Sequence, residues 1–226
     1  MTMATVVPEK GSKGKFVSDK VLEFFSECGD MKGDILIKTD QEPAIKYLAK
    51  DIVLERGNEP GCRTILEESP VGSSGSNGVV ERAVQSIEGQ VRAMKLALEN
   101  RIKAKVSAQS NVVAFMAGYA AYLLNRLEVG KDGKTAVERN RGKAATEMGV
   151  EFGEKVMYKK TVQNKASKIE PRWEKGIFVG VRARSVEFLV ATAQGIKKVR
   201  SVRRVAVQDR WGEDSVKWVR HVPWHL

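Results

Sequence analysis

The sequence predicts an α/β domain over residues 1–150, a small all-β domain over residues 151–207 and a Trp-rich tail over residues 208–226. Two changes near residue 150 support this division. Apolar residues follow mostly helical spacing before it and alternate from Gly153 onward, as in strands. The charge changes there too, because 22 basic and 20 acidic side chains precede the boundary and 17 basic and 8 acidic side chains follow it. The net charge therefore rises from +2 to +9.

Short strands and helices alternate at the start of the chain. We expect strands at 3–7 and 34–38 and helices at 17–28 and 42–55, the first helix ending at Gly29 and the second holding Pro43 in its first turn. This order predicts parallel strands in an α/β layer.

The rest of the first domain is expected to be helical after a loop. The segment SPVGSSGSNG (69–78) is rich in Ser and Gly and predicts a loop. A long helix follows it, with an apolar stripe formed by Val80, Val84, Ile87, Val91, Met94 and Leu98. We expect a second helix at 106–127, a turn at 131–134 and a short helix or a linker at 135–143.

The all-β domain is expected to hold four or five short strands. The segments VMYKK, GIFVGV, VEFLVAT and IKKVRSVRRV alternate in character and are separated by Gly or charged turns. They predict a small antiparallel sheet or barrel.

Composition excludes several classes of function. No apolar run is long enough for a transmembrane helix, and the first thirty residues lack a signal-peptide core, so we expect an intracellular protein. The chain has two cysteines, and its two histidines both lie near the C-terminus. These numbers and positions exclude a disulfide framework and a Cys/His zinc finger. The net charge of +11 favours a polyanion such as nucleic acid as partner, and a solvated basic surface is the alternative.

Asp40 and Glu81 are the candidate catalytic and metal-binding residues. Asp40 directly follows a predicted parallel strand, at the sheet edge where ligands gather in α/β folds. Glu81 lies on the polar side of the helix that follows the loop. Carboxylates from different elements can hold Mg²⁺ for displacement at phosphorus. The alternatives are ordinary ones: an Asp after a strand is usually a turn or cap residue, and a Glu in a first helical turn usually answers the helix dipole.

The segments around these two residues resemble a known family. ILIKTDQEPAI and SNGVVERAVQSIEGQVRAM resemble the second-aspartate and catalytic-glutamate segments of retroviral and retrotransposon integrases. YAAYLLNRLEVGKDGKTAVERNRGK resembles the helix and linker that close the core in retrotransposon Pol polyproteins, and FGEKVMYKK with the later strands resembles the small barrel beyond it. The resemblance implies an incomplete RNase H-like core followed by an SH3-like barrel, with Mg²⁺ or Mn²⁺ as cofactor, DNA as partner and the nucleus as location.

Two departures from the family qualify this expectation. The separation of Asp40 and Glu81 is longer than usual, which a loop absorbs at little cost in free energy. No aspartate stands where the family has its first catalytic carboxylate, so the first strands of the core are expected to be missing. Two carboxylates supply too few ligands for a metal pair, and we expect this chain alone to be inactive. An unpaired sheet edge would also favour a homo-oligomer.

Basic residues and one glutamine supply the candidates for DNA contact. These are Arg82, Gln85, Arg92 and Lys95 on the long helix, and Lys159, Lys160, Lys197, Lys198, Arg200, Arg203 and Arg204 in the β-domain. A cationic sheet face suits binding to phosphates without sequence preference, whereas a solvated surface is the alternative. Trp173 and Phe178 are expected in the core, with base stacking as the less favoured role. No small-molecule substrate or membrane is expected. The rival functions are a non-catalytic DNA- or chromatin-binding module and an RNase H-like nuclease that is not an integrase.

Overall fold

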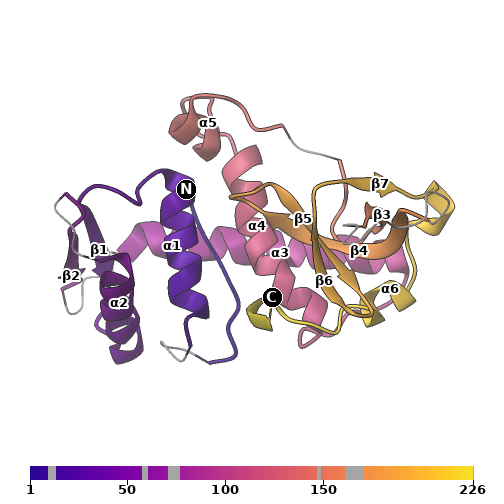
Figure 1. The fold of residues 1–226 in the computed structure, drawn as a ribbon, viewed down its shortest axis with the longest axis horizontal. Coiled ribbons are helices and arrows are strands. Elements are labelled where there is room, and N and C mark those ends of the chain that lie inside the picture. Colours follow the sequence, from indigo (N-terminus) through magenta and orange to yellow (C-terminus); the bar gives the residue numbers. More distant parts are fainter. Residues whose placement is uncertain (10–13, 58–60, 71–76, 147–148, 161–170, 226) are drawn as a thin grey trace. The chain divides into compact units, whose positions relative to one another are not determined.

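The structure is a computed structural model that describes residues 1–226 except 10–13, 58–60, 71–76, 147–148, 161–170 and 226. Packing divides the chain into two compact units (Figure 1). The first comprises Met1 and Val7–Ser86, and the second comprises Thr2–Val6 and Ile87–Leu226. The predicted boundary near residue 150 is therefore not where packing divides the chain, since residues 87–150 pack with the all-β region. The assignment of integrase domains to 1–150 and 151–207 stays a prediction.

The first unit is a two-stranded parallel sheet with helices. Its elements are α1 (Phe16–Cys28), β1 (Ile35–Thr39), α2 (Pro43–Arg56) and β2 (Thr64–Glu68), followed by the start of α3 (Gly78–Ile102). The two strands pair from Ile35 opposite Thr64 to Thr39 opposite Glu68. Helix α2 contacts both strands and α1 (Figure 1). The predicted helices and the strand after Asp34 are confirmed, as are Gly29 beyond α1, in the left-handed region, and Pro43 at the start of α2.

One predicted strand is absent, and one strand of the first unit was not predicted. Residues 3–7 form no strand. The backbone of Thr2 is instead held by the buried amide of Asn125, which accepts from its N–H at 2.8 Å and donates to its carbonyl at 2.7 Å. The strand that was not predicted is β2, which pairs with β1. Its sequence, TILEE, is mostly exposed and ends in two glutamates, so it lacks the alternation that predicts a strand.

The second unit places helices beside a five-stranded antiparallel sheet. Its helices are the rest of α3, α4 (Asn111–Leu127) and α5 (Ala136–Arg141). The strands are β3 (Lys155–Lys159), β4 (Trp173–Arg182), β5 (Glu187–Thr192), β6 (Gly195–Val199) and β7 (Val202–Arg204), in the order β6-β5-β4-β3-β7. The predicted strands are thus confirmed. A reciprocal capping box between Thr135 and Glu138 begins α5, so the short helix, not the linker, is correct.

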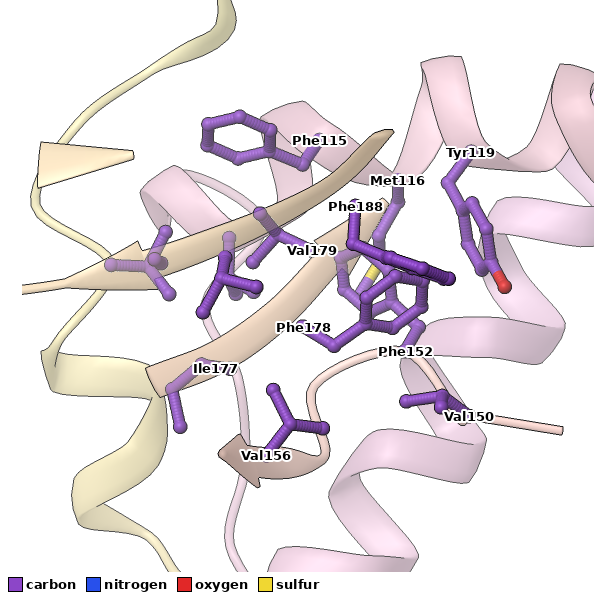
Figure 2. Packing of buried hydrophobic residues seen from close by; sticks show 14 of the residues in the cluster. Phe115, Met116, Tyr119, Val150, Phe152, Val156, Ile177, Phe178, Val179 and Phe188 are labelled. Atoms are coloured by element: carbon purple, nitrogen blue, oxygen red, sulfur yellow. The ribbon is translucent and has the colours of Figure 1, made fainter. Parts of the chain in front are cut away.

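The core of this unit joins the sheet to α4 (Figure 2). The ring of Phe178 on β4 meets the rings of Phe188 on β5 and Tyr119 on α4 edge-on, at centroid distances of 6.1 and 5.3 Å. The tail, which contains η2 (Val207–Asp209), α6 (Asp214–Lys217) and η3 (Pro223–His225), packs Trp211 and Trp218 against this core. Within the described part of the chain, no helix is both long and apolar enough to cross a membrane.

The apolar stripe of α3 is buried along only part of its length. Met94 and Leu98 are core residues, and Ile87 and Val91 pack against them. Val80 and Val84 are 64% and 49% exposed. The C-terminal part of the predicted stripe therefore packs in the core of the second unit, whereas its apolar residues in the first turns of the helix are exposed.

Candidate functional site

Hydrogen bonds tie the ends of three elements together around Asp40. Ser69, directly after β2, extends the ladder by donating its N–H to the carbonyl of Thr39 at 2.8 Å. Gln41 returns a bond from its side-chain amide to the carbonyl of Ser69 at 3.2 Å. The buried hydroxyl of Ser69 donates to Oδ1 of Asn77 at 2.8 Å, and α3 begins at the next residue. The carboxyl ends of β1 and β2 and the start of α3 are thus held at one edge.

The two candidate carboxylates lie near the ends of two of these elements. Asp40 directly follows β1 and Glu81 lies in the first turn of α3, and both are exposed. Oδ1 of Asp40 accepts from the N–H of Glu42 at 3.2 Å, a local turn that agrees with the ordinary role of an Asp after a strand. The position of Glu81 likewise agrees with an ordinary role, in which its negative charge interacts favourably with the N-terminal end of the helix dipole.

The neighbouring acids differ from these two in their partners. Glu67 and Glu68 at the end of β2 pair with Lys38 and Lys46 at 3.5 and 2.8 Å. Asp40 and Glu81 form no ion pair with any residue that the structure describes. Within the part of the chain that the structure describes, these two negative charges therefore have no cationic partner.

The donor chemistry at this edge suits one hard divalent ion. Carboxylate oxygens are what Mg²⁺ prefers, and it is commonly bound through one or two of them while it keeps several waters. Among the described residues there is no group of three or more His, Cys, Asp or Glu side chains that could hold a metal. Of the predicted loop, Asn77 is described, and Ser73, Ser74, Gly75 and Ser76 lie outside the described residues.

The predicted DNA-contacting residues of α3 divide into two pairs. Arg82 and Gln85 are exposed near the start of the helix. Arg92 lies 3.6 Å from Glu88, and Lys95 pairs at 2.5 Å with Glu99, which is buried. The hydrogen bond from Lys95 and a second one from the N–H of Val106 lower the pKa of Glu99 to about 2. Lys95 therefore compensates the buried charge of Glu99 in the C-terminal half of α3.

Some cations of the sheet are likewise committed to carboxylates. Glu174 accepts from the hydroxyl of Tyr158 at 2.6 Å and pairs with Lys160 at 3.1 Å, while Lys197 contributes a weaker attraction; all three lower its pKa. Burial raises the pKa of Tyr158 to about 12. Arg204 binds the buried carboxylate of Glu154.

The other cations lie on the opposite face of the sheet or near its turns. Met157 on β3 stands opposite Lys175 on β4 and Arg203 on β7, and Lys159 stands opposite Trp173. The guanidinium of Arg203 lies over the ring of Trp173, with Cζ 4.4 Å from the centroid. Lys198 faces Leu189 across the β5–β6 pair, and exposed Arg200 follows β6.

Sequence reasoning named Lys159 and Arg203 as DNA contacts but did not select Lys175 and expected Trp173 in the core. The roles of Trp173 and Lys175 could have been predicted from their spacing along β4. Trp173, Lys175 and Ile177 are two residues apart, which puts all three on one face of the strand. Phe178, predicted to be buried, is 1% exposed.

Comparison with known proteins shows a distant structural likeness and no match in sequence. No family model matches the chain, and no curated protein matches it. A solved structure with a similar chain is the cryoEM structure of the simian T-cell lymphotropic virus intasome in complex with PP2A regulatory subunit B56 gamma. The match has 12% sequence identity and a TM-score of 0.41. It covers 88% of this chain and 66% of that chain, so this chain spans just under two thirds of the length of the protein it matches.

Proposed function

We propose that this protein is a retrotransposon-type, integrase-like DNA-binding protein whose carboxylate edge, Asp40 and Glu81, binds a divalent cation. The observation that carries the proposal is a pair of carboxylates with no ion pair to any described residue. They stand at the ends of elements that Gln41, Ser69 and Asn77 join. The motifs around the two carboxylates, TDQEP and SNGVVER, support the same reading through their resemblance to integrases.

The proposed chemistry follows from the donor set. Asp40 and Glu81 would hold one Mg²⁺ or Mn²⁺. In a site with ligands for two ions such a metal would stabilise charge during in-line displacement at a phosphodiester, and with two carboxylates we expect this chain alone to bind the ion without turnover. Ser69 and Gln41 position the edge but offer no further charge. We propose that the basic second unit holds the DNA backbone. We also propose that a second copy pairs with an edge of the two-stranded sheet that no described strand covers, and that the protein acts in the nucleus.

The rival proposal is a non-catalytic DNA- or chromatin-binding module. It is favoured by the absence, among the described residues, of any group of three or more His, Cys, Asp or Glu side chains that could hold a metal. Both proposals require DNA binding, and only the first requires a cation at Asp40. Metal binding therefore separates them.

The first experiment measures DNA binding against salt. Fluorescence anisotropy with a labelled duplex should show an affinity that falls about 100-fold between about 50 and about 200 mM salt if about four phosphates are neutralised. An affinity that does not change with salt would contradict both proposals.

The second experiment measures Mn²⁺ binding by calorimetry in three forms of the full chain. We expect binding by the wild type, none by Asp40→Asn and undiminished binding by Glu67→Gln, the matched control at the same edge. Equal binding by wild type and Asp40→Asn would reject the metal site and leave the DNA-binding module as the better proposal.

A further inference from the structure

One end of the outer sheet face gathers cations around an aromatic ring. We call this the Trp173 face; its members are Met157, Lys159, Trp173, Lys175 and Arg203. Side chains that stand opposite one another in an antiparallel pair point to the same side, as do residues two apart in a strand. The register therefore places all five on one side of β3, β4 and β7.

Within the described residues, no ion pair compensates the positive charge of this face. Lys159, Lys175 and Arg203 are exposed, and none of them forms an ion pair with a residue in the described part of the chain. The adjacent acid, Glu174, points to the other side, where Tyr158 and Lys160 bind it. Three positive charges thus meet solvent together, which suits a polyanion.

The aromatic ring gives the face a second property. Trp173 is only partly buried, and Arg203 reaches across β3 to lie over its ring at 4.4 Å. Indole and guanidinium are both flat, and both are surfaces on which nucleobases stack. Plain attraction for phosphates needs lysines but no ring, so the charge alone does not account for this pair.

We propose that the Trp173–Arg203 pair is a stacking site for an unpaired nucleobase, with Lys159 and Lys175 neutralising the phosphates on either side. The ligand class is single-stranded DNA or the unpaired end of a duplex, because bases inside a duplex have both faces covered by their neighbours. Every base has a π face, so the site is expected to accept any sequence. This inference rests on the proposed DNA binding, which does not itself require any contact with a base.

The test compares two strands that differ only in their bases. The full chain is titrated by fluorescence anisotropy into a labelled dT 12-mer, an abasic 12-mer with the same phosphates, and a 12-base-pair duplex. The wild type should bind the dT strand more tightly than the abasic strand. Trp173→Ala should weaken dT binding between about 5-fold and about 150-fold and leave abasic binding unchanged.

Three further variants separate stacking from charge and from folding. Trp173→Phe retains a ring and should keep part of the preference for dT, which guards against loss of structure in the Ala variant. Lys175→Ala should weaken binding to both strands equally. Arg200→Ala is the matched control for Arg203→Ala: it removes the same charge from the turn before β7 and should leave the preference intact, whereas Arg203→Ala should reduce it.

The outcomes distinguish failure of the stacking site from failure of the proposed DNA binding. Equal affinity of the wild type for the dT and abasic strands, with salt-dependent binding retained, overturns the stacking site and leaves DNA binding standing. An equal loss for both strands in Trp173→Ala also overturns it. If no strand and no duplex is bound, both the inference and the proposed DNA binding fail.

Discussion

Arg204 donates two hydrogen bonds to Glu154, from Nε to Oε1 at 2.7 Å and from Nη2 to Oε2 at 2.8 Å. The carboxylate is fully buried, and it also accepts from the N–H of Glu151 at 3.1 Å and lies 3.4 Å from Nε of Arg210. A buried charge is tolerated in a fold only when its partners are in place. Arg204 is therefore a structural residue of the sheet, and the surface proposed for DNA does not include it.

The first prediction concerns this pair. Arg204→Ala should lower the free energy of unfolding by about 3 kcal/mol, because it leaves the Glu154 carboxylate buried with weaker compensation. Urea denaturation measures the change. Arg203→Ala is the control, since its side chain is exposed and its loss removes only the contact with the Trp173 ring, which should cost no more than about 1 kcal/mol. A stable Arg204→Ala variant with weakened DNA binding would return Arg204 to the DNA-contacting set.

The contrast between Arg203 and Arg204 shows where sequence reasoning stops. Alternation in KKVRSVRR predicts that one of the two lies on the same face as Lys198 and Arg200. The chain, however, turns at Arg200 and Ser201, so β6 and β7 are separate strands at opposite edges of the sheet. A turn resets the alternation, and only the pairing of β7 with β3 decides which arginine faces outward.

The second prediction concerns pH. Glu99 has its pKa lowered from 4.5 to about 2 by hydrogen bonds from Lys95 and from the N–H of Val106. A carboxyl whose pKa is lower in the folded state contributes stability above its unfolded pKa and loses it as pH falls toward the folded pKa. The difference in unfolding free energy between wild type and Glu99→Gln should therefore be full above about pH 5 and shrink between pH 4.5 and about 2.

Denaturant unfolding at several pH values measures this difference. Glu88→Gln is the control, because the Glu88–Arg92 pair at 3.6 Å is exposed on both sides and should contribute little at any pH. A wild-type advantage over Glu99→Gln that stays constant down to pH 2.5 would contradict the role of the Glu99 charge.

The third prediction uses two glycines that share a backbone conformation. Gly153 has φ +83°, and a Cβ there would lie 2.6 Å from Cδ1 of Leu98, which is 1% exposed. Gly133 has φ +75° and open space around it. Gly133→Ala should cost about 1–2 kcal/mol from the left-handed backbone alone. Gly153→Ala should cost a further 1–3 kcal/mol, roughly, because the methyl group overpacks the contact with α3.

Thermal unfolding of the two alanine variants checks the difference. The comparison isolates the steric contribution, because the backbone strain is the same in both. Equal destabilisation would mean that Leu98 moves aside without cost, and that α3 and the segment before β3 are less tightly packed than the burial of Leu98 implies.

The carboxylate edge was predictable from sequence only in part. Asp40 follows a short apolar run, so its place at a strand end could be predicted, and β1 confirms it. The partner strand β2 could not, because its TILEE sequence is mostly exposed and its signal depends on pairing with β1 rather than on its own pattern. Ser69, which closes the ladder and binds Asn77, was missed with it. Tertiary contacts, not local periodicity, made that part of the site.

The last prediction concerns activity. The full chain, with Mg²⁺ or Mn²⁺ and a labelled DNA duplex, should show neither strand cleavage nor strand transfer above the background of the Asp40→Asn variant. Displacement at phosphorus by the two-metal route needs ligands for two ions, and no group of three potential ligands occurs among the described residues. Gel electrophoresis of the labelled strand measures the products. Cleavage by the wild type that disappears in both Asp40→Asn and Glu81→Gln, but persists in Glu67→Gln, would mean that two carboxylates suffice at this edge. The protein would then be an active nuclease or integrase rather than a binding protein.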